Sequence, residues 1–183
     1  ILKTGCQSVS STNGVEPLDG EKMIMITLPP NYCSQENNGW DDCYKDRSRI
    51  EFYDKKGVKK GKTVTYDYWM YIPSDTDLLQ NGIPIVYLGQ LNTKTKSHYS
   101  SLVMVKWDEY GGIIFQVYNN FNFGNFTSFL LMELMPELKQ RDNWIYIKYV
   151  VDVYDDERGS LEIFVDGKSI VKKEKYPTIK KNG

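Results

Sequence analysis

Three charged residues alternate along one short stretch of the chain: Arg47, Arg49 and Glu51. Side chains two positions apart on a β-strand share a face, so a strand here would point all three charges in one direction. An ionised group is costly to bury without a partner, so this face does not belong in a core. The pattern predicts the floor of a cleft that holds an anionic ligand; a solvated outer strand face is the alternative.

Two cysteines, Cys33 and Cys43, precede this stretch and flank a polar loop. The length of the loop suits a disulfide, and a disulfide indicates an oxidising compartment and hence a secreted protein. The third cysteine, Cys6, is then unpaired or bonded to a group outside this chain. If Cys33 and Cys43 are not bonded, the secreted interpretation loses most of its support.

The single histidine of the chain, His98, lies in a loop-like segment. Because histidine has an unperturbed pKa near neutrality, His98 is a candidate acid or base, with a plain surface residue as the alternative. Lysines within residues 55–62 and 168–181 could steer an acidic polymer, although charged turns are usually just solvated. No His, Cys and Asp cluster has metal-ligand spacing, so we expect no cofactor; a structural calcium held by scattered oxygen ligands stays open.

The composition favours one globular domain rich in β-strands. The chain has 183 residues, enough for a proper core, and aromatic residues make up 14% of it, which favours strands over helices. The formal net charge is −1, so no overall field recruits nucleic acid or a membrane surface. No apolar run approaches the roughly 18 residues that a membrane-spanning helix needs. We therefore expect neither nucleic-acid binding nor membrane insertion.

Stretches of strand-forming residues with turn residues between them follow one another along most of the chain. After an irregular lead-in over residues 1–20, the expected strands cover residues 23–28, 47–53, 63–72, 83–92, 101–107, 113–119, 144–154, 160–165 and 168–173. Leucines at helical spacing predict one short helix over residues 129–138. Asp166-Gly167 predicts a hairpin turn. Many antiparallel strands in one domain of this size predict a β-sandwich or jelly roll.

Four short motifs follow one another along most of the chain, from about Gly20 onwards. They are Arg47-Ser48-Arg49-Ile50-Glu51, Tyr68-Trp69-Met70-Tyr71-Ile72-Pro73-Ser74-Asp75, Gly89-Gln90-Leu91-Asn92 and Leu161-Glu162-Ile163-Phe164-Val165-Asp166-Gly167-Lys168. In this order they resemble motifs of the jelly-roll polysaccharide lyases, which include heparin-lyase-like and glucuronan-lyase-like families and the related alginate lyases. The resemblance implies that residues 1–183 form a single concanavalin A-like jelly roll. Its two curved antiparallel sheets would place a sugar cleft on the concave one.

The resemblance also implies an enzyme that cleaves an acidic, uronate-containing polysaccharide by β-elimination. Such a lyase removes the proton next to a carboxylate, so it needs donors that neutralise the carboxylate as charge develops. Guanidinium and amide groups suit this task, and by resemblance Arg49 and Gln90 take the neutralising positions, with Glu51 orienting Arg49. The candidate catalytic residues are thus Arg49, Gln90, Asn92 and His98, and the candidate substrate-binding residues are Arg47, Glu51, Lys94 and Tyr118.

The chain departs from the family pattern at two places. The alginate lyases have a catalytic histidine two residues after the glutamine, where this chain has Asn92. Without the resemblance, Gln90 and Asn92 would be interpreted as ordinary polar residues at a strand end. The family's catalytic tyrosine lies on a strand that would follow residues 173–182. We expect this closing strand to lie beyond Gly183; the alternatives are that it comes from elsewhere or that the protein does no chemistry.

Both departures favour an alternative function, a non-catalytic carbohydrate-binding or structural module in a larger extracellular assembly. A third interpretation is an adhesion or virion-surface domain that uses the same sandwich as a spacer. A strand of the form Tyr-x-Lys-x-Gly-x-Tyr beyond Gly183 would favour the lyase over both alternatives.

The disulfide can be tested by Cys33→Ser. If Cys33 and Cys43 are bonded, we expect the variant to lose about 2–4 kcal/mol of unfolding free energy, because the cross-link restricts the unfolded chain. Thermal unfolding with and without a reductant measures this loss. The disulfide would be excluded if the reductant did not change the thermal stability of the wild type and if the variant were as stable as the wild type.

Overall fold

The computed structural model describes residues 5–27, 57–75, 86–94, 99–107, 113–117, 131–135 and 141–179, and within these ranges the chain is all-β. The strands are β1 (Gly5–Val9), β2 (Met23–Thr27), β3 (Thr63–Tyr71), β4 (Val86–Lys94), β5 (Tyr99–Trp107), β6 (Ile113–Val117), β7 (Leu131–Met135), β8 (Trp144–Asp152), β9 (Ser160–Val165) and β10 (Lys168–Lys173). Among the described residues there is no helix long and apolar enough to cross a membrane.

The first compact unit, residues 1–56, contains an antiparallel pair formed by β1 and β2. The prediction of an irregular lead-in over residues 1–20 is therefore wrong where β1 lies. β1 has little strand signal of its own, and it pairs along its whole length with β2, which satisfies the backbone groups on that edge of β1. In the intervening loop, Asn13 and Gly14 have φ angles of 49° and 79°, as in the tight turns that Asn-Gly favours.

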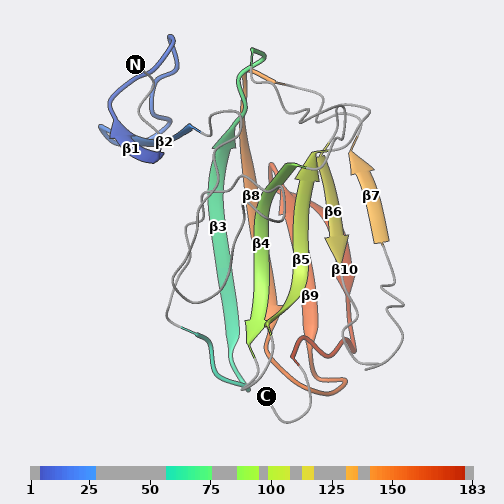
Figure 1. Cartoon of the computed structure of the whole chain (residues 1–183). Coiled ribbons are helices and arrows are strands. Elements are labelled where there is room, and N and C mark those ends of the chain that lie inside the picture. The colour runs from blue at the N-terminus through green and yellow to red at the C-terminus, as the bar shows by residue number, and fades with distance from the viewer. Residues whose placement is uncertain are drawn as a thin grey trace, which may run out of the picture. The chain divides into compact units, whose positions relative to one another are not determined.

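The second compact unit, residues 57–183, contains two four-stranded antiparallel sheets. Sheet I has the strand order β10-β9-β8-β3, and sheet II has the order β4-β5-β6-β7. Figure 1 shows the two sheets as separate layers, sheet II in front of sheet I. This arrangement confirms the predicted β-sandwich.

The turn predicted at Asp166-Gly167 joins β9 to β10, and both residues have positive φ angles, 49° and 81°. The short helix predicted over residues 129–138 is wrong, because Leu131–Met135 is strand β7 and pairs with β6. Local helix propensity is a weak preference, and the hydrogen bonds offered by the edge of a neighbouring strand override it here.

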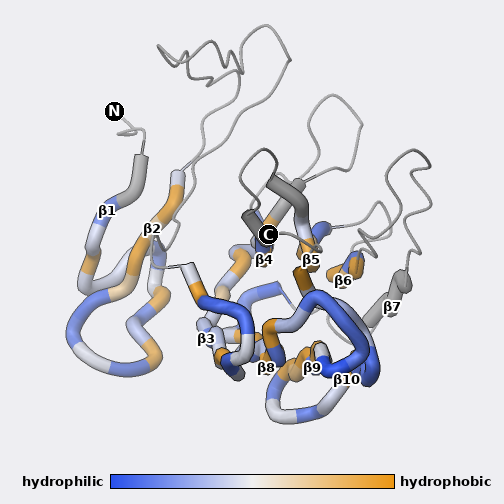
Figure 2. Tube along the Cα trace, turned by 90° about the horizontal axis from the view of Figure 1, so that it is seen from below, coloured by the Kyte–Doolittle hydropathy of each residue, from blue (hydrophilic) through white to orange (hydrophobic). Residues whose placement is uncertain are grey.

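The core lies between the inner faces of the two sheets. In β8, buried residues alternate with half-buried ones along the whole strand, as expected when one face packs and the other does not. The deepest side chains, each with 0% exposure, come from both sheets and include Val103, Val105, Phe115, Ile147, Leu161 and Ile163. Figure 2, coloured by hydropathy, shows hydrophobic residues along β8 and β9 and hydrophilic turns around β10.

A pair of tyrosine hydroxyls lies inside this core. The Oη atoms of Tyr68 on β3 and Tyr149 on β8 are 3.1 Å apart, within hydrogen-bond distance. Burial raises the pKa of both tyrosines, so both stay neutral. A Cβ atom at Gly89 on β4 would lie only 2.9 Å from the Tyr68 Oη. The glycine thus leaves room for the hydroxyl pair where β4 passes over sheet I.

The segment after β10 closes one end of the sandwich. The Tyr176 N–H donates to the Gly159 carbonyl oxygen at 2.8 Å, and the Thr178 N–H donates to the Tyr154 carbonyl oxygen at 2.8 Å. The Thr178 hydroxyl, in turn, donates to the Asp152 carbonyl oxygen at 2.8 Å. These bonds join the chain after β10 to the β8–β9 connection.

Gly159→Ala should destabilise this closure. A Cβ at position 159 would collide with the Tyr176 carbonyl oxygen, and backbone atoms cannot move aside as a flexible side chain would. We expect a loss of about 1–3 kcal/mol, measured by denaturant unfolding. Gly57→Ala is the matched control, because a Cβ added at position 57 would have no other atom within 4 Å. Equal stability of the two variants would show that residues 159 and 176 are not in contact.

Candidate functional site

The polar candidates of β4 lie on the face of sheet II that points away from the core. Leu88 and Leu91 pack against the core, whereas Gln90 and Asn92 are exposed. Cross-strand pairing with β5 and β6 places further residues on this face, although all five residues of β6 are buried. The described residues of this outer face of sheet II are Gln90, Asn92, Ser101, Met104, Lys106, Ile114 and Gln116.

Two irregularities in the β4–β5 pairing determine which residues meet on this face. The register shifts once between Tyr87 and Gly89 and again between Leu91 and Asn92. The second shift skips Leu102 on β5, which is buried, and places Asn92 opposite Ser101. In a regular ladder the polar Asn92 would instead oppose the apolar Leu102. The irregularity therefore brings two polar side chains together outside the core.

Ser101, Asn92 and Gln90 form a chain of directed hydrogen bonds. The Ser101 hydroxyl donates to Asn92 Oδ1 at 2.9 Å, and the Asn92 Nδ2 group donates to Gln90 Oε1 at 3.3 Å. Because Gln90 Oε1 accepts this bond, the Gln90 Nε2 group is the last group in the series of hydrogen bonds. Within the part of the chain that the structure describes, no group accepts a hydrogen bond from Gln90 Nε2. The arrangement offers two N–H donors to a ligand with acceptor oxygens.

The charge of the outer face of sheet II suits an anion. Lys106 on β5 is the cation among the described side chains of this face, and it lies in the same cross-strand register as Tyr87 and Ile114. None of the described residues of this face carries a carboxylate. Among the described side chains, an anionic ligand would therefore meet amide donors and a positive charge but no like charge.

A buried amide, Gln116 on β6, belongs to the same face. Gln90 pairs with Met104, which pairs with Gln116, so the two glutamines are two strands apart, roughly 10 Å. Gln116 is only 8% exposed, and its Oε1 atom is buried without a hydrogen-bond partner. A buried acceptor without a partner costs free energy, and such groups are uncommon outside functional sites. Sequence reasoning missed Gln116, although a lone amide in the apolar stretch Ile113–Val117 was a usable signal.

The structure brings together two of the predicted catalytic residues, Gln90 and Asn92. Lys94 lies at the end of β4, paired with Tyr99, so it belongs to the same strand. The other predicted site residues lie outside the described residues, and so do both cysteines of the expected disulfide; these are Arg47, Arg49, Glu51, His98, Tyr118, Cys33 and Cys43. Among the described side chains, no group of three or more His, Cys, Asp or Glu could hold a metal ion.

Comparison with known proteins gives one informative similarity. No model of a known protein family matches the sequence, and no curated protein matches it. The fold is similar to the crystal structure of an endo-β-1,4-glucuronan lyase from the fungus Trichoderma reesei, with a TM-score of 0.66. The match covers 97% of this chain and 71% of that chain, at 12% sequence identity. The chain therefore has a polysaccharide-lyase-like fold.

Proposed function

We propose that the outer face of sheet II binds an acidic, uronate-containing polysaccharide and that the protein cleaves it by β-elimination. The observation that carries this proposal is the hydrogen-bond chain from Ser101 through Asn92 to the exposed Gln90, whose Nε2 donors are left for a ligand. The polysaccharide-lyase-like fold supports the same class of reaction, and the name of the similar enzyme suggests glucuronan as a first substrate to test.

β-Elimination needs both charge neutralisation and proton transfer. A base removes the proton on the carbon next to the uronate carboxylate, and its electron pair forms a carbon–carbon double bond. The neighbouring glycosidic C–O bond breaks, and the departing oxygen receives a proton. Negative charge builds on the carboxylate oxygens during the first step, so donors fixed in place before the reaction lower its barrier.

In this proposal Gln90 and Arg49 neutralise the carboxylate, and Asn92 is a positioning residue. A carboxamide has no useful acid–base chemistry near neutral pH, so Asn92 does not replace the family's histidine as a base. Its bonds to Ser101 and Gln90 give it a different task, which is to orient the Gln90 amide. Proton transfer is then assigned to a tyrosine or to His98.

Binding of the polymer away from the reacting bond would use the remaining candidates. Arg47, Glu51, Lys94 and Tyr118 keep this role as proposals, and Lys106 joins them because it is the described cation of the face. An enzyme that meets such a polymer outside the cell has to be secreted, so the proposal includes secretion. Neither nucleic-acid binding nor membrane insertion is part of it, and it needs no cofactor.

The second candidate function is polysaccharide binding without cleavage. Asn92 favours it, because a carboxamide cannot act as the base that elimination needs. The described outer face of sheet II carries no histidine, tyrosine or carboxylate side chain that could act as the base. If no other residue supplies one, the same donors would hold the uronate without reacting with it, as a module of a larger extracellular assembly.

One experiment distinguishes the two candidate functions. The protein is incubated with glucuronan, alginate and heparin, and the ultraviolet absorbance of the unsaturated uronate product is followed while binding is measured by affinity electrophoresis. A rise in absorbance with one polymer establishes elimination. Retarded migration without any absorbance change would establish the binding module, and neither response with any acidic polymer would overturn the proposal.

Gln90→Glu should abolish most of the response to the acidic polymer. The substitution keeps the size of the side chain but replaces the Nε2 donors with an oxygen that repels the uronate carboxylate. We expect the rate to fall about 10²–10³-fold, the typical cost of losing one such donor. Arg49→Ala should have an effect of the same kind. Activity and binding assays measure the loss, and circular dichroism verifies the fold.

Thr65→Glu is the control for Gln90→Glu, because Thr65 is an exposed residue of β3 and the substitution adds the same negative charge. The control should keep wild-type behaviour. Equal losses in the two variants would assign the effect to net charge and would remove Gln90 from the site.

Gln116→Met should raise stability while it weakens polymer binding. The buried Gln116 Oε1 has no hydrogen-bond partner, and an unsatisfied buried group costs about 1–3 kcal/mol, which a methionine of similar shape would not incur. Thermal unfolding measures the gain, and affinity electrophoresis measures the loss of binding. A clear loss of stability would show that Gln116 is bonded within the protein and serves the fold.

A further inference from the structure

Four aromatic side chains form a block on the opposite side of the sandwich, on the outer face of sheet I. In the β3–β8 ladder Trp69 pairs with Tyr146, and Tyr71 pairs with Trp144. The ring centroids are 4.9 Å apart in the first pair and 5.5 Å apart in the second. The two pairs are separated by one residue along each strand, so the four rings share a face. We call Trp69, Tyr71, Trp144 and Tyr146 the aromatic grid.

The aromatic grid is not part of the core. The residues of β3 that pack inwards are Val64, Tyr66, Tyr68 and Met70, and they alternate with the grid residues. Trp69 is 48% exposed, the most exposed large apolar side chain among the described residues of the second unit. Cross-strand aromatic contacts stabilise a sheet, but they do not require an indole to stay this exposed to water.

Hydrogen bonds hold the grid tyrosines in place. The Tyr146 hydroxyl donates to Asp67 Oδ2 at 2.8 Å, and the Tyr71 hydroxyl donates more weakly to Asp142 Oδ1 at 3.5 Å. Hydrogen bonds from Ser74 lower the pKa of Asp142, so this carboxyl stays ionised at neutral pH. Rings fixed in this way lose little freedom when a ligand stacks on them.

The charge around the aromatic grid differs from that of the outer face of sheet II. Four carboxylates contact or adjoin the grid tyrosines: Asp67, Asp75, Asp142 and Asp166. Two cations lie next to these carboxylates, because Arg141 precedes Asp142 in the chain and Lys148 pairs with Asp67 in the β3–β8 ladder. Arg141 lies 5.0 Å from the Trp107 ring and donates to the Ser74 carbonyl oxygen, and Lys148 lies 5.7 Å from the Phe164 ring.

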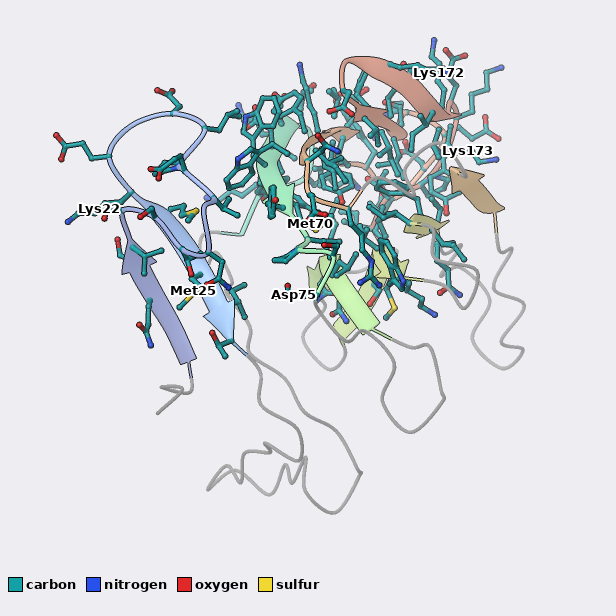
Figure 3. The ribbon with its side chains drawn as sticks, turned by 90° about the horizontal axis from the view of Figure 1, so that it is seen from above. Lys22, Met25, Met70, Asp75, Lys172 and Lys173 are labelled. Carbon is teal, nitrogen blue, oxygen red and sulfur yellow. The ribbon has the colours of Figure 1, made fainter. Side chains whose placement is uncertain are left out.

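Further lysines of sheet I lie far from the grid. Lys172 and Lys173 are on β10, and β10 and β3 form opposite edges of sheet I. Figure 3 shows both lysines at the β10 edge, away from Met70 and Asp75. The grid therefore presents flat apolar rings next to acceptor oxygens, and among the described residues beside it the carboxylates outnumber the cations. A uronate polymer would be repelled there, whereas an uncharged ligand with apolar faces and many hydroxyl donors fits.

We propose that the aromatic grid binds a neutral polysaccharide. The flat faces of its sugar rings stack on Trp69 and its neighbours, and its hydroxyls donate to the surrounding carboxylates, Asp67 and Asp142 first. Because sheets I and II share one core, their outer faces point in opposite directions. A neutral polymer on the aromatic grid and an acidic polymer on the outer face of sheet II can thus be bound together, and the grid anchors the protein to a mixed polysaccharide matrix.

Affinity electrophoresis in gels containing hydroxyethylcellulose, xyloglucan or galactomannan tests the proposal. We expect at least one of these neutral polymers to retard the protein, with little change on adding salt, since no charges are paired. Trp69→Ala should weaken the retardation about tenfold, the equivalent of one lost stacking contact. Trp69→Tyr should restore much of it. The exposed indole of Trp69 should also shift its fluorescence emission to shorter wavelength on binding.

Thr65→Ala is the matched control, because Thr65 lies on β3 and points to the same side as the grid but is not part of it. It should bind as the wild type does, and unfolding measurements should show that both variants fold. Absence of retardation by all three neutral polymers would overturn the proposal. So would equal retardation of the wild type and Trp69→Ala, or loss of binding to acidic polymers in Trp69→Ala. None of these results depends on lyase activity.

Discussion

The contact between the inner faces of sheets I and II is the constraint on which the rest of the molecule depends. Successive side chains of a strand point to opposite faces. Wherever one residue is buried in the core, its two neighbours along the strand therefore lie on the outer face. Burial of Val103 and Val105 leaves Met104 on the outer face of sheet II, and inward packing of Tyr68 leaves Trp69 on the outer face of sheet I. Both candidate binding surfaces are consequences of one hydrophobic interface.

The β3–β8 ladder of sheet I is regular and the β4–β5 ladder of sheet II is interrupted, and this difference separates the two surfaces. The β3–β8 ladder runs without a shift, which gives the aromatic grid its ordered rows. The β4–β5 ladder shifts twice, and the shifts admit Gly89 under the Tyr68 hydroxyl and pair Asn92 with Ser101. A regular sheet makes a flat platform, whereas irregularities re-aim individual side chains. The two surfaces therefore suit different ligands, stacking on one and directed donors on the other.

Much of the fold could be predicted from local pattern alone. The strands β3, β8 and β9 and the turn at Asp166-Gly167 follow from alternation and turn chemistry, because both signals depend on residues close in sequence. The failures were at β1 and β7. Each is a short strand that depends on hydrogen bonds to a partner distant in sequence, and for β7 the spacing of its leucines also fits a helix. Pairing with a neighbour decided these cases.

For the candidate site, the sequence by itself determined the chemistry available and part of its placement. Gln90 and Asn92 share a parity on one strand, so their common face was predictable. Only the tertiary structure decided that Ser101 would orient Asn92, because a register shift at Leu102 is a property of two strands together. Likewise, no local pattern reveals that Gln116 is buried without a partner. Burial and cross-strand register depend on segments far apart in the chain, and they exist only once the sheets have formed.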